Sequence, residues 1–387
     1  MKQLCIVSEE SIISGCAVTG VAELADSVGS AFVNDYDVTV VCPDGGGMLV
    51  NLSTEVYQYT PKLRKCRIFG MTYFLIHRSI WETEAVRIVD NLHPDIVHSF
   101  ATPELLTGLT NRPEKIIYTI DNVDMITDPE GLRFYDAVAT VSEAYAEELR
   151  NKDNALGRVL REIDFRGVTC GVMSNVMTPT TGLLLTAKYS ADDQSGKELC
   201  KASLCKTYGI AKDAPIFLMM CRLVRAKGVP QVLDCIESFK EVGGHLLIVG
   251  YGERAIEQRL RALNEDSDIT WVGGNQLLLR ALPLLAGADF FLSPSLREPC
   301  GLMVMNACHY GAIPITTLAG GLGNNMDEDV ALIIRSAYDL PDGIDRAAEL
   351  YADKNALIAK RRVAMTKDFS WATRKQGYIE MYEAVSA

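Results

Sequence analysis

Three basic side chains follow one predicted strand and a carboxylate follows another, in positions where they could act on a charged ligand. Arg222, Arg225 and Lys227 come directly after the apolar run 215–221. Glu298 comes directly after the apolar run 289–295. Arginine is a planar bidentate donor and lysine a compact charge, so the basic group suits a pyrophosphate. A carboxylate can accept hydrogen bonds from sugar hydroxyls, and it can stabilise positive charge that develops on an anomeric carbon.

Each group also has a purely structural explanation. The basic residues could form a solvated turn that ends at Gly228, and Glu298 could pair with Arg297 or cap a helix. A functional site is favoured by Gly301, which is predicted to begin the helix at 301–310. The first N–H groups of a helix have no partner within it and form an anion site, and glycine lets the backbone approach a phosphate or a sugar closely.

The elements that would hold these residues are strands of a parallel sheet. Short apolar runs alternate with amphipathic segments in the second half of the chain, at residues 215–221, 245–250, 268–273, 289–295, 312–317 and 330–335. Such runs are typical of strands that are buried on both faces of a parallel sheet. Ligands of open parallel sheets bind beyond the carboxyl ends of the strands. The loops after 215–221 and 289–295 therefore predict one binding edge, to which the glycine-rich segment 319–325 adds a third loop.

The first half of the chain shows the same alternation. Its apolar runs predict strands at residues 3–8, 37–42, 95–100, 115–120 and 136–142. Between the strands at 37–42 and 95–100, a helix is predicted to start at Ser79, with Glu82 three residues later completing a capping box. The alternation weakens between residues 150 and 212. We therefore predict an α/β protein with two doubly wound, Rossmann-like domains, over residues 1–195 and 196–369.

The composition excludes several classes of function. A net charge of −12 argues against general nucleic-acid binding, although a few placed cations suffice for a small anionic ligand. No apolar stretch approaches the roughly 20 residues of a membrane span, and the N-terminus lacks a signal-peptide pattern. The 11 Cys include no CxxC pair, and no two of the five His stand at metal-ligand spacing. We expect reduced thiols, a cytoplasmic location and no metal site.

The segments around these residues resemble the glycogen and starch synthases. The run "REPCGLMVMNACHYGAIPITTLAGGLG" at 297–323 carries the resemblance most clearly. Other segments that look like the family occur in family order and cover nearly the whole chain, at residues 135–149, 189–210, 221–228, 286–295 and 369–385. The resemblance implies the GT-B architecture, in which two Rossmann-like domains face a cleft. It also implies that a helix at 370–387 crosses back to complete the first domain.

The function that the resemblance implies is retaining transfer of glucose from a nucleotide sugar, ADP-glucose or UDP-glucose, to an α-1,4-glucan or a related glycan acceptor. Arg222 and Lys227 would hold the donor diphosphate, and Glu298 would lie beside the donor sugar, so these three side chains are the candidate catalytic residues. No cofactor is implied besides this donor substrate, and no metal. The other implied donor-binding positions are backbone amides and glycines: Cys300, Gly301, Leu302, Gly320, Gly321 and Gly20.

The first domain departs from the family pattern. The family has a Lys-x-Gly-Gly loop after its first strand, whereas the matching segment "AVTGVAEL" has Val18 in place of the lysine. The family also has a His-Asp-Trp-His stretch with a catalytic histidine, of which only His98, at the first histidine, remains. We therefore expect the donor-binding residues of the second domain to be kept and the acceptor-binding and catalytic residues of the first domain to be altered. Two alternatives stay open: a GT-B transferase with a different acceptor, and a non-catalytic homologue that binds nucleotide sugar or glucan.

Overall fold

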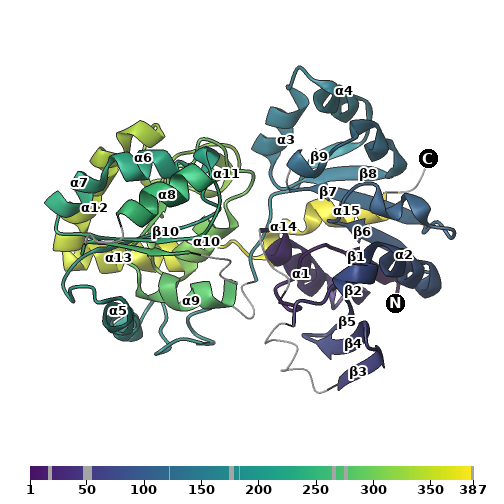
Figure 1. Ribbon diagram of the computed structural model, residues 1–387, viewed down its shortest axis with the longest axis horizontal. Coiled ribbons are helices and arrows are strands. Elements are labelled where there is room, and N and C mark those ends of the chain that lie inside the picture. Colours follow the sequence, from purple (N-terminus) through teal and green to yellow (C-terminus); the bar gives the residue numbers. More distant parts are fainter. Residues whose placement is uncertain are drawn as a thin grey trace. The chain divides into compact units, whose positions relative to one another are not determined.

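The computed structural model divides the chain into two compact units (Figure 1). Unit 1 consists of Met1–Met173 and Ser370–Ala387, and unit 2 of Ser174–Phe369. The division falls earlier than the predicted boundary at residues 195 and 196. Its physical reason is that Tyr189 already packs in unit 2, where its hydroxyl donates to the Tyr310 carbonyl. The residues that the structure describes are 1–15, 20–46, 55–121, 123–173, 178–182, 184–263, 267–273 and 278–384.

Unit 1 is built on one sheet whose order, among the described residues, is β3-β4-β5-β2-β1-β6-β7-β8-β9. The strands from β5 to β9 in this order run parallel, and β4 is antiparallel to both of its neighbours. The strands are β1 (Gln3–Val7), β2 (Asp37–Pro43), β3 (Glu55–Thr60), β4 (Leu63–Ile68), β5 (Met71–Ile76), β6 (Ile96–Ser99), β7 (Lys115–Ile120), β8 (Ala137–Thr140) and β9 (Phe165–Gly167).

The helices of unit 1 include two that return from the end of the chain. They are α1 (Gly20–Phe32), α2 (Trp81–Leu92), α3 (Glu143–Arg150), α4 (Ala155–Glu162), α14 (Trp371–Arg374) and α15 (Gln376–Glu383), with short 3₁₀ turns at Arg78–Ile80, Leu105–Gly108, Val123–Met125 and Pro129–Phe134. Burial holds α15 in place, since its Tyr378 and Tyr382 side chains are almost completely buried. The return of the C-terminal helices to the first unit is what the resemblance implied.

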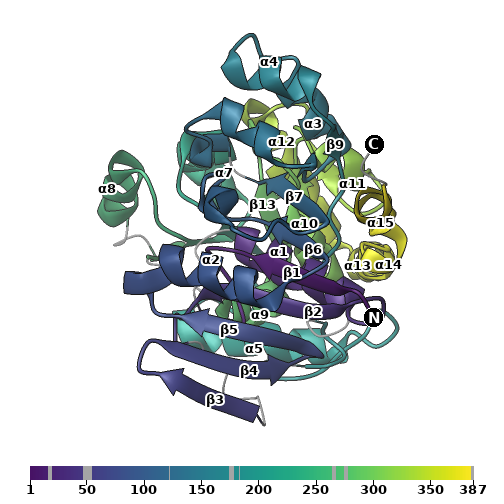
Figure 2. The same ribbon diagram turned by 90° about the vertical axis from the view of Figure 1, so that its right-hand side faces the viewer.

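Two local features of unit 1 differ from the prediction. The segment β3–β5 forms an antiparallel edge of the sheet, seen at the lower end of unit 1 in Figure 2, where no strand was predicted. All six residues of β3 are exposed, whereas β5 is an apolar and largely buried run, MTYFLI, that was not predicted as a strand. The predicted capping box is also wrong, because α2 begins at Trp81 and the Ser79 N–H donates to His77 Nδ1 instead.

Unit 2 is a doubly wound sheet of parallel strands in the order β12-β11-β10-β13-β14-β15. All six strands predicted between residues 215 and 335 are present: β11, β13 and β14 are buried throughout, β10 is buried except at its last residue, and β12 and β15 are only partly buried. They are β10 (Ile216–Met220), β11 (His245–Val249), β12 (Ile269–Val272), β13 (Phe290–Ser293), β14 (Ile313–Thr316) and β15 (Leu332–Ile333).

Helices cover both faces of the unit 2 sheet. Figure 1 shows α5 and α9 on the lower face and α6, α7 and α8 on the upper face. The helices are α5 (Ser195–Tyr208), α6 (Val229–Asp234), α7 (Ile236–Glu241), α8 (Arg254–Ala262), α9 (Leu278–Gly287), α10 (Leu302–His309), α11 (Leu322–Asn325), α12 (Leu340–Ala352) and α13 (Lys354–Thr366), with 3₁₀ turns at Arg225–Lys227 and Ala337–Asp339. This arrangement leaves the carboxyl ends of the strands to the connecting loops.

Candidate active site

Three loops of unit 2 meet at one edge of its sheet. They follow β10, β13 and β14, which are neighbours and run parallel, so all three loops leave the sheet on the same side. The N–H groups of Leu296 and Arg297 both donate to the Ala226 carbonyl, at 2.8 and 3.1 Å. The N–H of Gly321 donates to the Glu298 carbonyl at 2.8 Å. These backbone contacts bind the three loops into one continuous surface, as the parallel pattern predicted.

Two of the predicted catalytic side chains lie in direct contact across these loops. Lys227 Nζ is 2.7 Å from Glu298 Oε2, and the Ser295 hydroxyl donates to the same oxygen at 3.2 Å. The side chains of Lys227 and Glu298 are 20% and 12% exposed, so the pair is screened from water on most sides but is open to a ligand. The structural alternatives considered for Glu298 were a pair with Arg297 and a helix cap. A partner on a different loop was not considered. No feature of the sequence predicted that Lys227 and Glu298 would pair.

The other cations of the loop after β10 differ in their surroundings. Arg222 is exposed at the start of the loop. Arg225 is exposed as well: its side chain is 83% exposed with the guanidinium 4.0 Å from the Glu253 carboxylate, and its backbone N–H donates to that carboxylate at 3.1 Å. The Glu253 carboxylate competes with an anionic ligand for Arg225, so Arg222 is the better candidate of the two for a diphosphate.

The glycines of the third loop are explained by close packing against the Glu298 segment. A Cβ on Gly320 would lie 2.4 Å from the Glu298 carbonyl oxygen, and Gly320 has φ of +53°. A Cβ on Gly321 would lie 2.3 Å from the Pro299 carbonyl oxygen. Larger residues would push the two loops apart. These glycines thus help to fix the backbone from which Glu298 projects.

The helix start predicted at Gly301 is present. Gly301 has φ of +88° and precedes α10, which has no side-chain cap at this end. The side chains of Cys300 and Leu302 are buried, so these positions can present only backbone groups to a ligand. Sequence reasoning missed Asn325, whose buried amide donates to the Cys300 and Gly321 carbonyls at 2.9 Å each. The only sign of these hydrogen bonds in the sequence was a polar residue at the end of the glycine-rich segment 319–325.

Gly20 is the one candidate that belongs to unit 1, where it is the exposed first residue of α1. Val18, at the position of the family's lysine, lies outside the described residues. His98 is completely buried on β6, with Nδ1 2.7 Å from the Tyr382 hydroxyl and Nε2 2.7 Å from the Thr119 hydroxyl. Burial lowers the pKa of His98 to about 3, so the ring is neutral near pH 7. His98 therefore fastens α15 to the sheet and is no candidate for proton transfer.

Glycosyltransferases are among the known proteins that this chain resembles. The family model described as glycosyl transferases group 1 matches residues 203–363. The glycogen synthase of Opitutus terrae is 32% identical over 318 residues, which are 77% of this chain and 66% of that protein. The glycogen synthase of Thermodesulfovibrio yellowstonii is 28% identical over 373 residues, 88% of this chain and 74% of that protein. The catalytic domain of starch synthase IV from Arabidopsis thaliana, solved with ADP and acarbose, matches with a TM-score of 0.84 at 20% identity and covers 99% of this chain and 98% of that chain.

The chain belongs to the glycogen and starch synthase family of GT-B glycosyltransferases. The resemblance and the fold class inferred from the sequence are thereby confirmed. The chain spans about two thirds of the length of the Opitutus terrae relative. In the part of the chain that the structure describes, no group of three or more His, Cys, Asp or Glu could hold a metal ion. No helix within the same residues has the length and apolar character to cross a membrane.

Proposed function

We propose that the chain is a retaining glucosyltransferase that transfers glucose from ADP-glucose or UDP-glucose to an α-1,4-glucan or a related glycan. The Lys227–Glu298 contact supports this most directly. It places a cation suited to a diphosphate beside a carboxylate suited to a sugar, on the edge of the sheet where such folds bind ligands. The starch synthase IV domain bound ADP and the oligosaccharide acarbose in its own structure, which fits the same pair of ligands.

The proposed chemistry is mainly electrostatic. As the bond between the anomeric carbon and the donor phosphate breaks, negative charge grows on the diphosphate and positive charge on the sugar. Arg222, Lys227 and the first amides of α10 would neutralise the diphosphate, and Glu298 would stabilise the sugar cation. The leaving phosphate would take the proton of the incoming hydroxyl, whose oxygen then bonds to the anomeric carbon on the same face. No metal ion takes part in this scheme.

Turnover tests the proposal directly. The pure protein would be mixed with ADP-glucose or UDP-glucose, with and without glycogen, while release of nucleoside diphosphate is followed. We expect release that requires an acceptor and is unchanged by EDTA. We expect it to be slower on glycogen than the roughly 10 s⁻¹ of a median enzyme, because the histidine and lysine of the family's first domain are replaced. Nucleotide binding without turnover on any acceptor would instead indicate the non-catalytic homologue.

Nucleotide affinity should depend on the two candidate cations. Arg222→Ala and Lys227→Ala should each weaken binding of ADP or UDP by about 10- to 100-fold, because each removes a charge-assisted contact. Lys227→Ala should have the larger effect, since it also leaves Glu298 unpaired beside the diphosphate. Isothermal titration calorimetry measures both. Arg225→Ala is the matched control, because this cation lies in the same loop but has the Glu253 carboxylate 4.0 Å from its guanidinium. Equal affinity in all three variants would contradict the assignment.

A further inference from the structure

Strand β3 forms one edge of the unit 1 sheet. Among the described residues, its hydrogen-bonded neighbour in the sheet is β4 alone, so its other side faces away from the sheet. An edge strand carries backbone N–H and C=O groups on that side, which can pair with a strand of another chain. All six residues of β3 are exposed. Tyr57 and Tyr59 are each 58% exposed and Val56 is 46% exposed, so apolar side chains accompany this edge.

The other edge strands of the two sheets are shorter and better covered. Strand β9 ends the opposite side of the unit 1 sheet with three residues, and β12 and β15 end the unit 2 sheet with four and two. None of the residues in these three strands is as exposed as those of β3. Proteins avoid pairing at edges with short strands, or with Lys and Pro on the edge. Strand β3 has six residues and contains neither Lys nor Pro, so it is the least protected of the four described edges.

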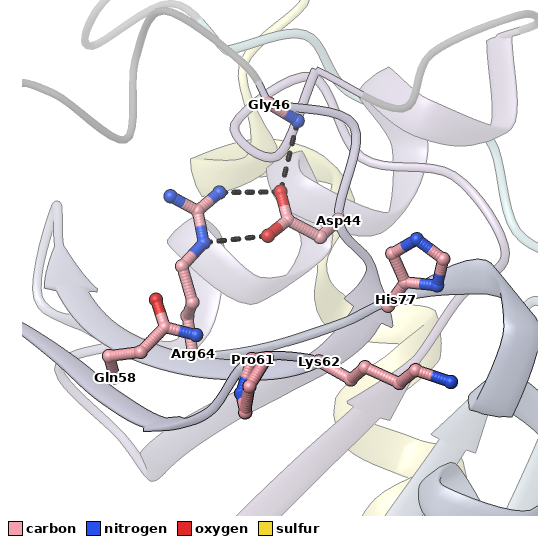
Figure 3. A pocket seen from close by; sticks show the side chains of 7 residues that line it. All are labelled: Asp44, Gly46, Gln58, Pro61, Lys62, Arg64 and His77. Carbon is pink, nitrogen blue, oxygen red and sulfur yellow. Dashed lines mark hydrogen bonds and ion pairs between the residues drawn. The ribbon is translucent and has the colours of Figure 1, made fainter.

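Side-chain contacts hold the hairpin of β3 and β4 in place. Arg64 of β4 forms a bidentate ion pair with Asp44, which follows β2: Nε donates to Oδ2 at 2.6 Å and Nη2 to Oδ1 at 2.5 Å (Figure 3). The Gly46 N–H donates to the same carboxylate at 2.9 Å. Lys62, in the turn of the hairpin, donates to the Ser79 hydroxyl at 3.0 Å. A partner that pairs with β3 therefore meets a preorganised strand, and little conformational entropy is lost on binding.

The charges at the two ends of β3 favour antiparallel pairing with an identical strand. The only charged residue of β3 is Glu55, at its first position, and Lys62 comes shortly after its last. When two copies of β3 run antiparallel, the Glu55 end of each lies beside the Lys62 end of the other. Opposite charges then meet at both ends, whereas parallel pairing would bring like charges together. Antiparallel order is also the order that a twofold axis between two identical edges produces.

The basic side chains of β4 do not prevent this pairing. Arg64, Lys65 and Arg67 lie one strand back from the edge, and Arg64 is neutralised by Asp44. In a pair of copies, the two β4 strands are separated by three strand spacings of ~4.8 Å, or about 14 Å. This distance exceeds the Debye length of about 8 Å at physiological ionic strength. Repulsion between the two basic strands is therefore largely screened.

We propose that β3 pairs antiparallel with β3 of a second copy of this chain, which joins the unit 1 sheets of two chains into one. In this pair, the Tyr57 side chains of the two copies lie opposite each other on the twofold axis. The pairing uses the regular part of the strand, because the shift in register between β3 and β4 falls between Gln58 and Thr60. Directly opposed aromatic side chains stabilise an antiparallel pair. The inference concerns unit 1 alone and does not depend on the proposed transfer activity.

Sedimentation velocity of the full chain between about 1 and 200 μM tests this association. We expect the mass to rise with concentration from the 42.5 kDa of one chain to that of a dimer and no further, because a twofold contact is complete with two copies. Tyr57→Lys should raise the dissociation constant at least about tenfold, since it replaces the aromatic pair with two like charges on the axis. Tyr338→Lys is the matched control: Tyr338 is 75% exposed in unit 2, and its replacement should leave the dissociation constant unchanged.

Tyr57→Cys tests the contact itself, since two thiols on the axis are within reach of one short bismaleimide cross-linker. We expect a covalent dimer of this variant on denaturing electrophoresis, well above the amount formed by the control Tyr338→Cys. The proposal is overturned if the chain keeps the mass of one copy up to about 200 μM, or if assemblies larger than dimers form. It is equally overturned if the two lysine variants associate alike, or if the two cysteine variants give the same amount of covalent dimer.

Discussion

Replacing Glu298 by alanine or glutamine is expected to lower the rate of glucose transfer by about 100- to 1,000-fold, the usual cost of removing a group that stabilises developing charge. The affinity for ADP or UDP should change by less than about threefold. Positive charge on the sugar exists only as the glycosidic bond breaks, so the carboxylate acts on the transition state more than on the bound donor.

The pairing of Glu298 with Lys227 sharpens this expectation. In the unliganded protein the carboxylate neutralises part of the lysine's charge at a distance of 2.7 Å. Removing Glu298 therefore leaves Lys227 free for the diphosphate, and nucleotide affinity has no reason to fall. The Lys227→Ala variant should show the reverse pattern, with the loss visible in nucleotide affinity.

Glu253→Gln is the matched control for Glu298, because Glu253 is a carboxylate on the neighbouring loop and contacts Arg225 rather than the proposed donor site. Transfer rates come from diphosphate release at saturating donor, and affinities come from calorimetry. Should both Glu298 variants keep more than about a tenth of the parent rate, the proposed role of the carboxylate is refuted.

The sheet of unit 2 and its binding edge could be predicted because they depend on a strong pattern. Strands such as β11 and β13 are continuous apolar runs, and a parallel sheet fixes where the following loops go. That rule brought the segments of Lys227 and Glu298 to one edge before any contact was known. It could not show that the two side chains pair, since pairing depends on the path of each loop. The path is set by contacts such as those of Asn325 with Cys300 and Gly321.

The pattern of apolar residues could not predict exposed strands, or polar contacts between residues far apart in the sequence. The hairpin of β3 and β4 was missed because β3 is exposed along its length and three of the six residues of β4 are charged, so neither has the apolar signal of a strand. A lysine in a helix usually faces water. Lys197 of α5 is instead buried, and its Nζ lies within hydrogen-bond distance of four backbone carbonyls, at Leu285, Ala286, Ala288 and Tyr310. Its burial lowers the pKa of Lys197 well below its usual value.

Asp289 is the centre of a buried ionic cluster in unit 2, and its loss should have the largest effect on stability. Lys201 Nζ donates to its Oδ2 and Arg361 Nη2 to its Oδ1, both at 2.6 Å, and the Ile216 N–H donates to Oδ2 at 2.9 Å. The side chain of Lys201 is 7% exposed, that of Asp289 1% and that of Arg361 3%. Burial alone would lower the pKa of Lys201, but the Asp289 carboxylate more than offsets this and the pKa is raised.

Asp289→Asn should therefore destabilise unit 2 by about 3–5 kcal/mol, since it leaves the buried Lys201 without its counter-charge and Arg361 with only the exposed Glu198, 3.3 Å away. Lys201→Met should cost less, because Arg361 still neutralises the carboxylate and the methionine is apolar. Asp234→Asn is the surface control: its pair with Arg259 is largely exposed, and its loss should cost less than about 1 kcal/mol. If charge balance stabilises the cluster, the loss of stability should be largest in Asp289→Asn, smaller in Lys201→Met and smallest in Asp234→Asn. If packing alone mattered, Asp289→Asn, which keeps the side-chain size, would have little effect.

Hydrogen exchange followed by mass spectrometry resolves the effect by unit, which a single unfolding curve of a two-unit chain would not. In Asp289→Asn, amides of β10, β13 and β14 should exchange about 140- to 3,700-fold faster, the rate equivalent of the expected loss of stability. Amides of β6 and β7 belong to unit 1 and serve as the internal reference, with no change expected. If the amides of unit 2 kept their protection, or if Lys201→Met exposed them more than Asp289→Asn did, the cluster would not be held together by the charge of Asp289.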